Sequence, residues 1–448
     1  MMSKRITKPS PISGFPEWLP QVRRAEQMWF DHIRTIFEQY GFCPIETPSV
    51  EALDILNAKG EDEGDDVDKE VYVIERLHKE DGDKEARLAL HFDQTVPLAR
   101  YTAQHYNELV FPFKRYQMQR VWRGERPQAG RFREFYQCDI DVIGVDTLPA
   151  HFDAEMPAII WEVLASLPGM EDEKIQIQIS NRKILIGLLQ ALGVTNIVEA
   201  TRIIDKLDKL PENEIRSLLN EQIGMAHDAC ETVLKLATIK ATDSSFAQRV
   251  YDLGIENDMM REGVEELSFV MDQLAHIPTG GVVADLSIVR GLDYYTGTVY
   301  ETRFVDDPTY GSICSGGRYD DLASNYINRT LPGVGISIGF SRLFDRIRQK
   351  QQLPALGISP ADIMVIMPSE DRRAAAQSTA HTLRQRGFNV EVFHSGSKLK
   401  RQMAYAEKKG IPYVWFPPFD DSGESKHEIK KMTTGEQASA DPESWTRD

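Results

Sequence analysis

The sequence of 448 residues is long enough for roughly two or three domains, each with a sizeable hydrophobic core. Hydrophobic residues make up 41% of it, as in ordinary globular proteins. No run approaches the ~18 apolar residues that cross a bilayer, and the N-terminus lacks the apolar stretch of a signal peptide. The net charge of −17 excludes a surface that is basic throughout. It does not exclude a nucleic-acid partner, because phosphate contacts need only a local basic patch.

The four cysteines, Cys43, Cys138, Cys230 and Cys314, lie far apart and form no CxxC pair. This spacing argues against a zinc site or a disulfide framework and fits the reducing cytoplasm. We expect each of them to be a buried, unreactive thiol.

The first predicted element is an amphipathic helix over Arg23–Tyr40, and Gly41 is typical of a helix C-terminus. A short strand should follow, and Pro48 closes it because proline is confined to strand edges. An ordinary helix packed on a sheet explains this pattern as well as an interface helix does.

Two further strands are expected over Val71–Leu77 and Arg87–Phe92. Directly after the second come Asp93, Gln94 and Thr95. A carboxylate and a hydroxyl at the end of a strand can receive an ammonium group through charge-assisted hydrogen bonds. This position is therefore a candidate site for an amine.

Tyr116–Gly144 predicts a hairpin whose two strands are joined by a loop at Gly124–Gly130. Polar and apolar side chains alternate in the second strand, so they should lie on opposite faces of the sheet. A polar row of this kind fits a polar ligand lying along the sheet, and it fits the solvated face of a half-exposed sheet equally well. The polar row consists of Arg131, Arg133, Gln137, Asp139 and Asp141.

Lys174–Ser180 alternates strictly and should be a half-buried strand. From Asn181 to Ile277 the pattern changes to successive helices with apolar stripes. We find no catalytic constellation in this region, so a packing role is predicted.

Three stretches rich in glycine and arginine come next. Arg290–Gly297 offers an arginine suited to bidentate contact with a carboxylate or a phosphate. The paired glycines of Cys314–Asp320 let the backbone approach a ligand or a strand closely. Gly333–Leu343 predicts a strand, a turn and a helix. The sequence has neither a P-loop nor a GxGxxG turn, so any phosphate should be held by arginines.

Lys350–Pro360 resembles a linker in composition, and from Ile363 to Phe416 strands and helices alternate. This alternation predicts a small α/β unit with a parallel sheet. A solvated helix face explains its basic cluster as well as a binding surface does. The cluster consists of Lys398, Lys400, Arg401, Lys408 and Lys409.

Several of these stretches resemble one family. Arg123–Pro127, followed by Arg131–Gln137, is similar to motif 2 of class II aminoacyl-tRNA synthetases in its histidyl form. Arg290–Gly297 and Cys314–Asp320 resemble the two histidine-specific signatures, and Gly333–Leu343 resembles motif 3. The N-terminal helix, strand and proline resemble motif 1, which forms the dimer interface in that family. Together the resemblance covers nearly the whole chain.

The resemblance implies an α/β protein with an α+β catalytic core. This core is the antiparallel class II synthetase sheet with flanking helices, a helical insertion and a C-terminal α/β anticodon-binding domain. The expected bounds are 1–180 for the first part of the core, 181–277 for the insertion, 278–350 for the second part and 361–448 for the anticodon-binding domain. A cytoplasmic homodimer is also implied. Contact with the tRNA acceptor stem is a second interpretation of the insertion.

The implied activity is the ATP-dependent ligation of L-histidine to tRNA(His) through a histidyl-adenylate, with Mg²⁺ as cofactor. By resemblance, the catalytic residues are Arg123 and Arg290, and no side chain is assigned as a metal ligand. ATP is held by Arg123, Glu125, Arg131 and Arg342. Histidine is held by Asp93, Gln94, Thr95, Arg123, Gln137, Asp141, Arg290, Tyr294 and Tyr295.

Asp141 and Tyr295 are expected at the imidazole nitrogens. A site built to hydrogen-bond a polar side chain rejects analogues that lack it by about 10⁴–10⁵ without editing. The sequence departs from the family at His91 and Phe92, where an arginine followed by an aromatic residue or proline is usual. We expect the arginines and acids of these separate segments to converge on one cleft.

Two other functions compete with this one. The first is a non-catalytic, synthetase-like regulatory subunit of ATP phosphoribosyltransferase, which lacks the anticodon domain and loses the histidine-specific signatures. The sequence keeps both features. The second is a stress-sensing, synthetase-like RNA-binding module, and the sequence shows no kinase segments to accompany it.

Overall fold

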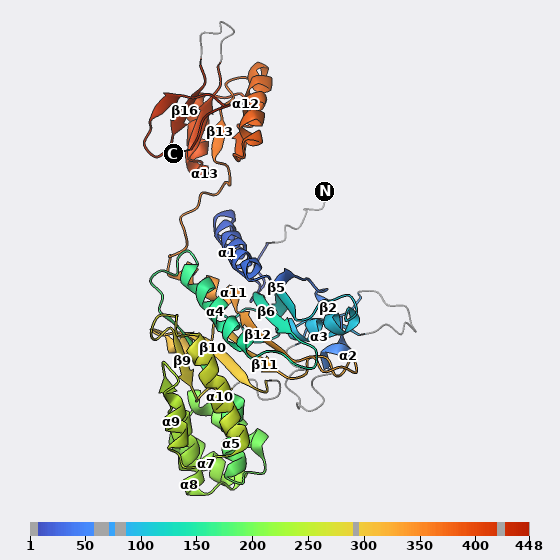
Figure 1. The fold of residues 1–448 in the computed structure, drawn as a ribbon. Helices are drawn as coiled ribbons and strands as arrows, with labels where there is room; N and C mark the ends of the chain where they lie inside the picture. The colour runs from blue at the N-terminus through green and yellow to red at the C-terminus, as the bar shows by residue number, and fades with distance from the viewer. Residues whose placement is uncertain (1–7, 58–70, 77–86, 290–294, 419–425, 448) are drawn as a thin grey trace. The chain divides into compact units, whose positions relative to one another are not determined.

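The computed structural model describes residues 8–57, 71–76, 87–289, 295–418 and 426–447 (Figure 1). The chain divides into two compact units. The first contains Met1–Pro16 and Phe30–Gln352, and the second contains Glu17–Trp29 and Leu353–Asp448.

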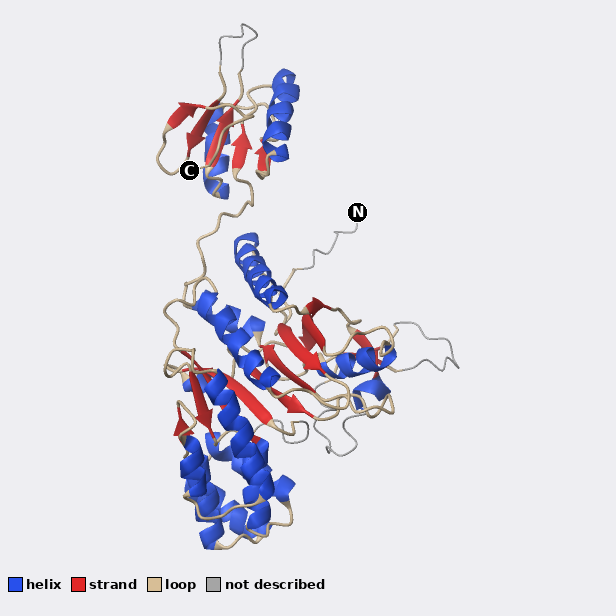
Figure 2. Cartoon of the chain, in the orientation of Figure 1, coloured by secondary structure: helices blue, strands red, loops and turns tan. Residues whose placement is uncertain are grey.

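The first unit is built on a nine-stranded sheet, seen in red in Figure 2. All neighbouring strands are antiparallel except β1 with β5 and β7 with β9. The strands in spatial order are β1 (Cys43–Pro44), β5 (Phe113–Trp122), β6 (Glu134–Ile143), β12 (Gly333–Ile338), β11 (Cys314–Tyr319), β10 (Thr298–Phe304), β7 (Ile175–Asn181), β9 (Val282–Asp285) and β8 (Lys240–Ala241).

One face of this sheet is apolar. Cys138, Ile140 and Val142 alternate along β6 and are fully buried. The helices that pack on this side are α4 (His151–Ser166), α11 (Phe340–Gln349) and the part of α1 (Pro20–Gln39) that starts at Phe30. The ring of Phe340 stacks on that of Phe30 at a centroid distance of 4.0 Å, and both rings contact Tyr136.

The opposite face of the same strands is polar. Strand register aligns Asp141 with Arg115 on one side and with Gly335 on the other. In the next row of the sheet, Asp139 lies between Gln117 and Ser337. Because side chains alternate along a strand, these groups share one face, and it is the face of the sheet that carries the candidate site.

A buried ion pair joins α4 to the central strands. Arg318 of β11 donates from Nε and Nη2 to the carboxylate of Asp153, with a shortest distance of 2.6 Å. The hydroxyls of Thr298 and Tyr300 donate to the carboxylate and the backbone carbonyl of Asp153. The buried carboxylate of Asp153 therefore accepts hydrogen bonds from both Arg318 and Thr298.

Smaller elements flank the sheet. A three-stranded sheet consists of β2 (Val50–Ala52), β4 (Leu88–Leu90) and β3 (Val73–Ile74), and it is accompanied by α2 (Leu53–Asn57) and α3 (Thr95–Gln104). Between β7 and β9 the chain forms α5 (Arg182–Ala191), α6 (Ile197–Ile204), α7 (Glu212–Ile223), α8 (His227–Ala237), α9 (Phe246–Tyr251) and α10 (Asp258–Gln273). Figure 1 shows these helices gathered beyond the β7–β9 end of the sheet.

The second unit contains a five-stranded sheet in the order β14 (Val390–Val392), β13 (Ile363–Val365), β15 (Tyr413–Phe416), β16 (Glu428–Lys431) and β17 (Gln437–Ser439). Helices α12 (Arg373–Gln385) and α13 (Leu399–Lys409) complete it. Its core is built around Val365, Phe393 and Trp415. Arg24 of α1 donates to the carbonyl of Ser359 at 2.7 Å, which ties the start of α1 to this unit.

The predicted fold class, a mixed α/β protein with a large central sheet and flanking helices, is confirmed. Three details differ from the sequence prediction. The C-terminal sheet is only partly parallel, because β16 and β17 add to it in antiparallel fashion. The region between β7 and β9 includes the short strand β8 as well as helices. Cys43 is exposed, whereas the other three cysteines are buried as expected.

Among the helices that the structure describes, none combines the length and the apolar character that crossing a membrane requires.

The ion pair of Asp153 generates a stability prediction. Asp153→Ala should lower the free energy of unfolding by about 3–5 kcal/mol, because it leaves the largely buried guanidinium of Arg318 without its carboxylate. Urea unfolding of the full chain, followed by far-UV circular dichroism, measures this change. Asp31→Ala is the control, since Asp31 is exposed in its pair with Arg34, and such pairs contribute less than about 1 kcal/mol. Equal losses in both variants would contradict the assignment.

Candidate active site

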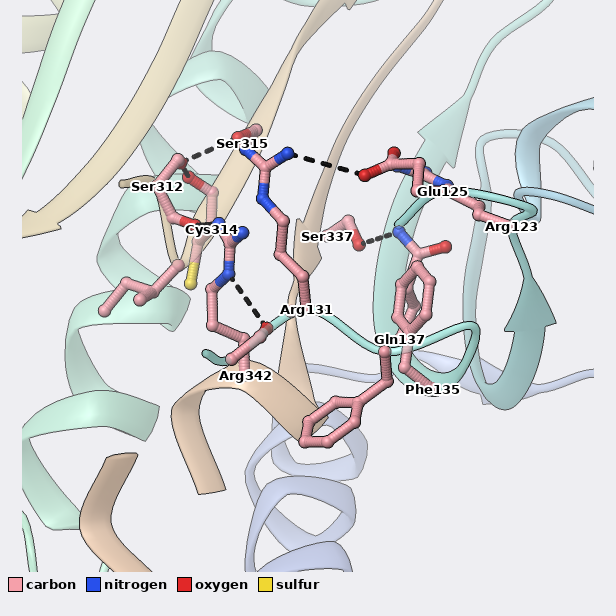
Figure 3. Close-up of a pocket in the computed structure, with 14 residues that line it drawn as sticks. Arg123, Glu125, Arg131, Phe135, Gln137, Ser312, Cys314, Ser315, Ser337 and Arg342 are labelled. Carbon is pink, nitrogen blue, oxygen red and sulfur yellow. Dashed lines mark hydrogen bonds and ion pairs between the residues drawn. The ribbon is translucent and has the colours of Figure 1, made fainter. Parts of the chain in front are cut away.

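A cavity of about 360 Å³ opens on the polar face of the central sheet (Figure 3). Its walls come from the β5–β6 loop, from β6, β11 and β12, and from the start of α11. The residues that line it are Arg123, Glu125, Gly130, Arg131, Phe132, Phe135, Gln137, Ser312, Ile313, Cys314, Ser315, Ser337, Gly339 and Arg342.

Three arginines give the cavity its positive character. Arg131 is exposed and reaches across to Glu125, with 3.4 Å between Nη1 and Oε2. Arg123 donates from Nε to the carbonyl of Phe92 at 3.1 Å, and its guanidinium lies over the ring of Phe135. The sequence predicted Arg123, Glu125 and Arg131 as one group, and the structure brings them together.

Arg342 is the third arginine, and it is fixed by two carbonyls. Its Nε donates to Gly130 at 3.2 Å and its Nη1 donates to Ser312 at 2.7 Å. Burial and the neighbouring charge of Arg131 lower the pKa of Arg342. Two adjacent guanidinium groups repel each other, so a polyanion between them would be strongly favoured.

Gln137 marks the end of the cavity that lies along β6. Its Nε2 donates to the hydroxyl of Ser337 at 2.8 Å, while its Oε1 is a buried acceptor with no donor in the described part of the chain. Buried acceptors are normally satisfied, so this oxygen suits a donor from a ligand. Gln94 plays a supporting part instead, because it is fully buried and its amide donates to the backbone carbonyls of Gln119 and Gln137.

A second polar group lies farther along β6, centred on Asp141. Its Oδ2 lies 2.5 Å from Nη2 of Arg115, and its Oδ1 accepts from the hydroxyl of Tyr319 at 3.1 Å. Tyr295 belongs to the same group: its pKa is raised by burial and by the negative charges of Asp141, Asp139 and Asp93. The three carboxylates and Tyr295 are thus close in space.

Two glycines make room for this group. A Cβ atom at Gly335 would collide with the carboxylate of Asp141, and one at Gly317 would lie 2.7 Å from the ring of Tyr295. The glycines of the two adjacent strands therefore let Asp141 and Tyr295 approach the sheet closely. This is the physical reason for their positions in Cys314–Asp320 and Gly333–Leu343.

Residues 91–95, which follow β4, join the site to β5 and to the start of α3. Oδ1 of Asp93 accepts from the backbone N–H of Val96 at 3.2 Å, which caps the start of α3 beside Thr95. His91, the departure from the family pattern, is fully buried and its Nε2 lies 2.7 Å from the carbonyl of Arg120. Burial lowers the pKa of His91, so the ring is a neutral donor that joins this segment to β5.

Arg290 and Tyr294 lie outside the described residues. Within the described part, the predicted residues gather at two ends of the polar sheet face, and their convergence on one cleft stays a prediction. Gln137 and Asp141 are four residues apart on β6, which places them roughly 13 Å from each other. Arg123 and Arg342 line the cavity at the first end, and Asp93, Asp141 and Tyr295 gather at the second.

Sequence reasoning missed several contributors to the site. Arg115 is 1% exposed and pairs with Asp141, yet it was not singled out. The signal was the alternation Arg115, Gln117, Gln119 on β5, which mirrors that of β6. Phe135 and Ser337 had no comparable signal, because their place depends on which strands become neighbours.

The comparisons with known proteins bear on this arrangement. Residues 14–343 match the family model described as histidyl-tRNA synthetase, and residues 362–445 match the model described as anticodon binding domain. The chain belongs to the histidyl-tRNA synthetase family. The family membership extends over both units, since the two matched segments leave only short stretches uncovered.

Relatives of the histidyl-tRNA synthetase family match over their whole length. A protein named histidine–tRNA ligase from Thermobifida fusca is 52% identical, over 99% of this chain and 100% of its own. A histidine–tRNA ligase from Micrococcus luteus is 45% identical, over 98% and 97%.

Solved structures agree with the fold. The histidyl-tRNA synthetase from a Nostoc species superposes with a TM-score of 0.85 at 37% identity, over 97% of both chains. A structure titled ATP phosphoribosyltransferase regulatory subunit/histidyl-tRNA synthetase, from Bacillus halodurans, gives 0.74 at 18% identity, over 93% of this chain and 100% of its own. At that identity the second likeness concerns the fold alone.

Asp139 generates a pH prediction. Burial, with smaller contributions from Asp141 and Asp93, raises its pKa from 3.8 to about 7, although Arg115 and Ser337 oppose the shift. Between these values the folded chain binds a proton that the unfolded chain has lost. The contribution of Asp139 to stability is therefore complete below pH 3.8 and is lost as the pH rises through about 7.

The side chain of the Asp139→Asn variant does not titrate, so its stability should not fall for this reason as the pH rises. The unfolding free energy of the variant minus that of wild type should therefore increase by on the order of 2 kcal/mol from pH 5 to pH 8. Urea unfolding at several pH values measures the gain. Asp243→Asn is the control, because hydrogen bonds from Ser245 lower the pKa of Asp243 and its effect should be constant over this range. A difference for Asp139→Asn that does not vary with pH would contradict the prediction.

Proposed function

We propose that this chain is a histidine–tRNA ligase, which activates L-histidine with ATP and transfers it to tRNA(His). The observation that carries the proposal is an arginine-lined cavity and, farther along the same sheet face, a group of acidic side chains beside Tyr295. Relatives with the name histidine–tRNA ligase match the chain from end to end, which supports the same activity. An aminoacyl-tRNA ligase of class II is the family's enzyme class.

The arginine end suits the nucleotide. Arg131 and Arg342 would engage the outer phosphates, because guanidinium groups match phosphate oxygens through paired hydrogen bonds. Glu125 would lie near the adenine, and Phe135 adds an aromatic surface for a flat ring. Arg123 lines the same cavity and would hold the α-phosphate together with the histidine carboxylate.

The acidic end suits the amino acid. Asp93, Thr95 and the unpartnered Oε1 of Gln137 would receive the α-ammonium group. Asp141 and Tyr295 would bond the imidazole nitrogens, and Tyr294 and Gln94 would support this pocket. An imidazole is selected here because an analogue without ring nitrogens would leave buried polar groups unpaired.

The reaction needs positioning and charge stabilisation more than proton transfer. A carboxylate oxygen of histidine bonds to the α-phosphorus of ATP while the bond to the pyrophosphate oxygen breaks. Arg123 and Arg290 would stabilise the negative charge that develops on the α-phosphate. The terminal hydroxyl of tRNA then bonds to the histidine carbonyl carbon, and AMP leaves.

Magnesium would arrive with the nucleotide. Among the described residues no group of three or more His, Cys, Asp or Glu side chains could hold a metal ion. Glu125 is the one carboxylate among the described residues that line the cavity, and Mg²⁺ commonly takes one or two protein carboxylates together with substrate phosphates. The donor set therefore fits an ion held mainly by ATP, whose charge would offset that of the phosphates.

We assign the remaining parts by the same reasoning. The catalytic core would comprise residues 1–180 and 278–350, with the insertion at 181–277 and the anticodon-binding domain at 361–448. The enzyme would act in the cytoplasm as a homodimer through the motif 1 region. Light scattering checks the dimer, since one chain has a mass of 50.9 kDa and the proposal requires twice that value.

The alternative, a regulatory subunit of ATP phosphoribosyltransferase, is not favoured. The solved structure whose title includes that function shares the fold but only 18% of residues, whereas named ligases share up to 52% in these comparisons. The C-terminal segment also matches the anticodon-binding model.

Histidine-dependent exchange of pyrophosphate into ATP tests the proposal. The purified chain should catalyse exchange with histidine and charge tRNA(His) when tRNA is added. Absence of exchange in a folded protein would exclude the activity. Exchange without charging would support the formation of histidyl-adenylate and contradict the transfer of histidine to tRNA(His).

A pair of variants tests the two ends of the site. Asp141→Asn should raise the KM for histidine by about tenfold or more, because one hydrogen bond to a charged group contributes about 1.5–3 kcal/mol, and leave that for ATP unchanged. Arg342→Met should raise the KM for ATP and leave the KM for histidine unchanged. Steady-state exchange kinetics with each substrate varied give both values. If both variants raised the same KM, the assignment of two ends would be wrong.

A further inference from the structure

Helix α5 begins with an unusual first turn. It contains Arg182 and Lys183 and no acidic residue. Cations are disfavoured at the positive N-terminal end of a helix dipole, so both need compensating partners. Lys183 has them on α10, where Glu262 and Glu266 lie 2.7 Å and 2.5 Å from its Nζ. Arg182 contacts a different part of the molecule.

Arg182 follows the last residue of β7 and makes two hydrogen bonds to the segment that precedes β10. β10 and β7 pair as far as Thr298 opposite Asn181. The backbone N–H of Arg182 then donates to the carbonyl of Gly297 at 2.9 Å. Beyond that point β7 has become a helix, so it offers no backbone donor to the carbonyl of Tyr295. The side chain of Arg182 takes that place, with Nη1 donating to it at 2.6 Å.

The segment held in this way carries Tyr295 to the acidic end of the site. Thr296 is fixed on the other side, because its N–H donates to the carbonyl of Arg318 at 2.8 Å. The ring of Tyr295 packs on the bare backbone of Gly317. Its backbone is therefore placed by Arg182 and its ring by Gly317, and the ring faces the charge of Asp141.

We propose that Arg182 is a positioning residue for the histidine pocket. By fixing the carbonyl of Tyr295 it sets where the phenol hydroxyl lies and so tunes the recognition of imidazole. Asn181, the residue before Arg182, donates to Glu266 of α10 at 2.7 Å, so α10 holds the start of α5, where Arg182 lies. The helical region thereby supports amino-acid selection. This inference rests on the proposed function, in which Tyr295 contacts the substrate side chain.

The test uses the full chain and three variants. Arg182→Met keeps the length of the side chain and removes its donors, and Arg182→Lys restores one donor. Arg216→Met is the matched control, because Arg216 belongs to the same helical region but pairs with Glu231 at 2.6 Å. Pyrophosphate exchange gives the KM for histidine and for ATP, and thermal unfolding with and without histidine gives a readout independent of turnover.

Arg182→Met should raise the KM for histidine about tenfold, equivalent to about 1.4 kcal/mol, and leave the KM for ATP within about twofold. It should also reduce the histidine-induced rise in Tm. Arg182→Lys should fall between Arg182→Met and wild type, and Arg216→Met should match wild type in both KM values.

An unchanged KM for histidine would overturn the inference, and so would a parallel rise in both KM values, which indicates a general structural role. If Arg182→Met does not fold, the KM values of Arg182→Lys are used instead: an unchanged KM for histidine, or a parallel rise in both KM values, would overturn the inference. A wild-type chain without exchange contradicts the proposed function itself, whereas an active wild type with an unaffected Arg182→Met contradicts the inference alone.

Discussion

The buried contact of Arg115 with Asp141 is the constraint on which the polar face depends. A guanidinium and a carboxylate removed from water stabilise a fold only when geometry and further hydrogen bonds offset their desolvation. Here the register of β5 with β6 brings the two charges together, the hydroxyl of Tyr319 adds a hydrogen bond and Gly335 leaves space, while Nε and Nη1 of Arg115 are buried with no partner among the described residues. Each of these conditions involves a different strand. A slip of one residue between β5 and β6 would turn one of the two charges to the apolar face, where α4 and α11 pack, and a slip of β11 or β12 would remove Tyr319 or Gly335 from this contact.

The polar face also brings several carboxylates, including that of Asp139, close to one another. Among the described residues, three carboxylates act on Tyr295, and burial raises the pKa of one of them, Asp139, to about 7, so that it is only partly ionised at neutral pH. Placing acids so close together reduces stability, and this cost is common at functional sites. A cationic substrate group would relieve the repulsion when it binds.

The sequence was sufficient for features that depend on local pattern. The alternation of β6 placed Gln137, Asp139 and Asp141 on one face, and the strand–turn–helix pattern placed Arg342 at the start of α11. It was insufficient where the outcome depends on distant neighbours. Arg182 and Tyr295 are 113 positions apart, and their contact exists because β7 ends at Asn181, before the ladder would have reached Tyr295. The antiparallel additions to the C-terminal sheet likewise follow from pairing that no short window reveals.

Cys43 has a practical consequence. It is the exposed member of four cysteines and lies on the edge strand β1, beside Arg115 in the adjacent strand. A thiol-reactive fluorophore would therefore attach at a single known place while the buried thiols, including Cys314 in the cavity wall, stay unmodified. Such a probe would sense from outside whether this edge of the sheet is open to solvent or covered in the assembled molecule.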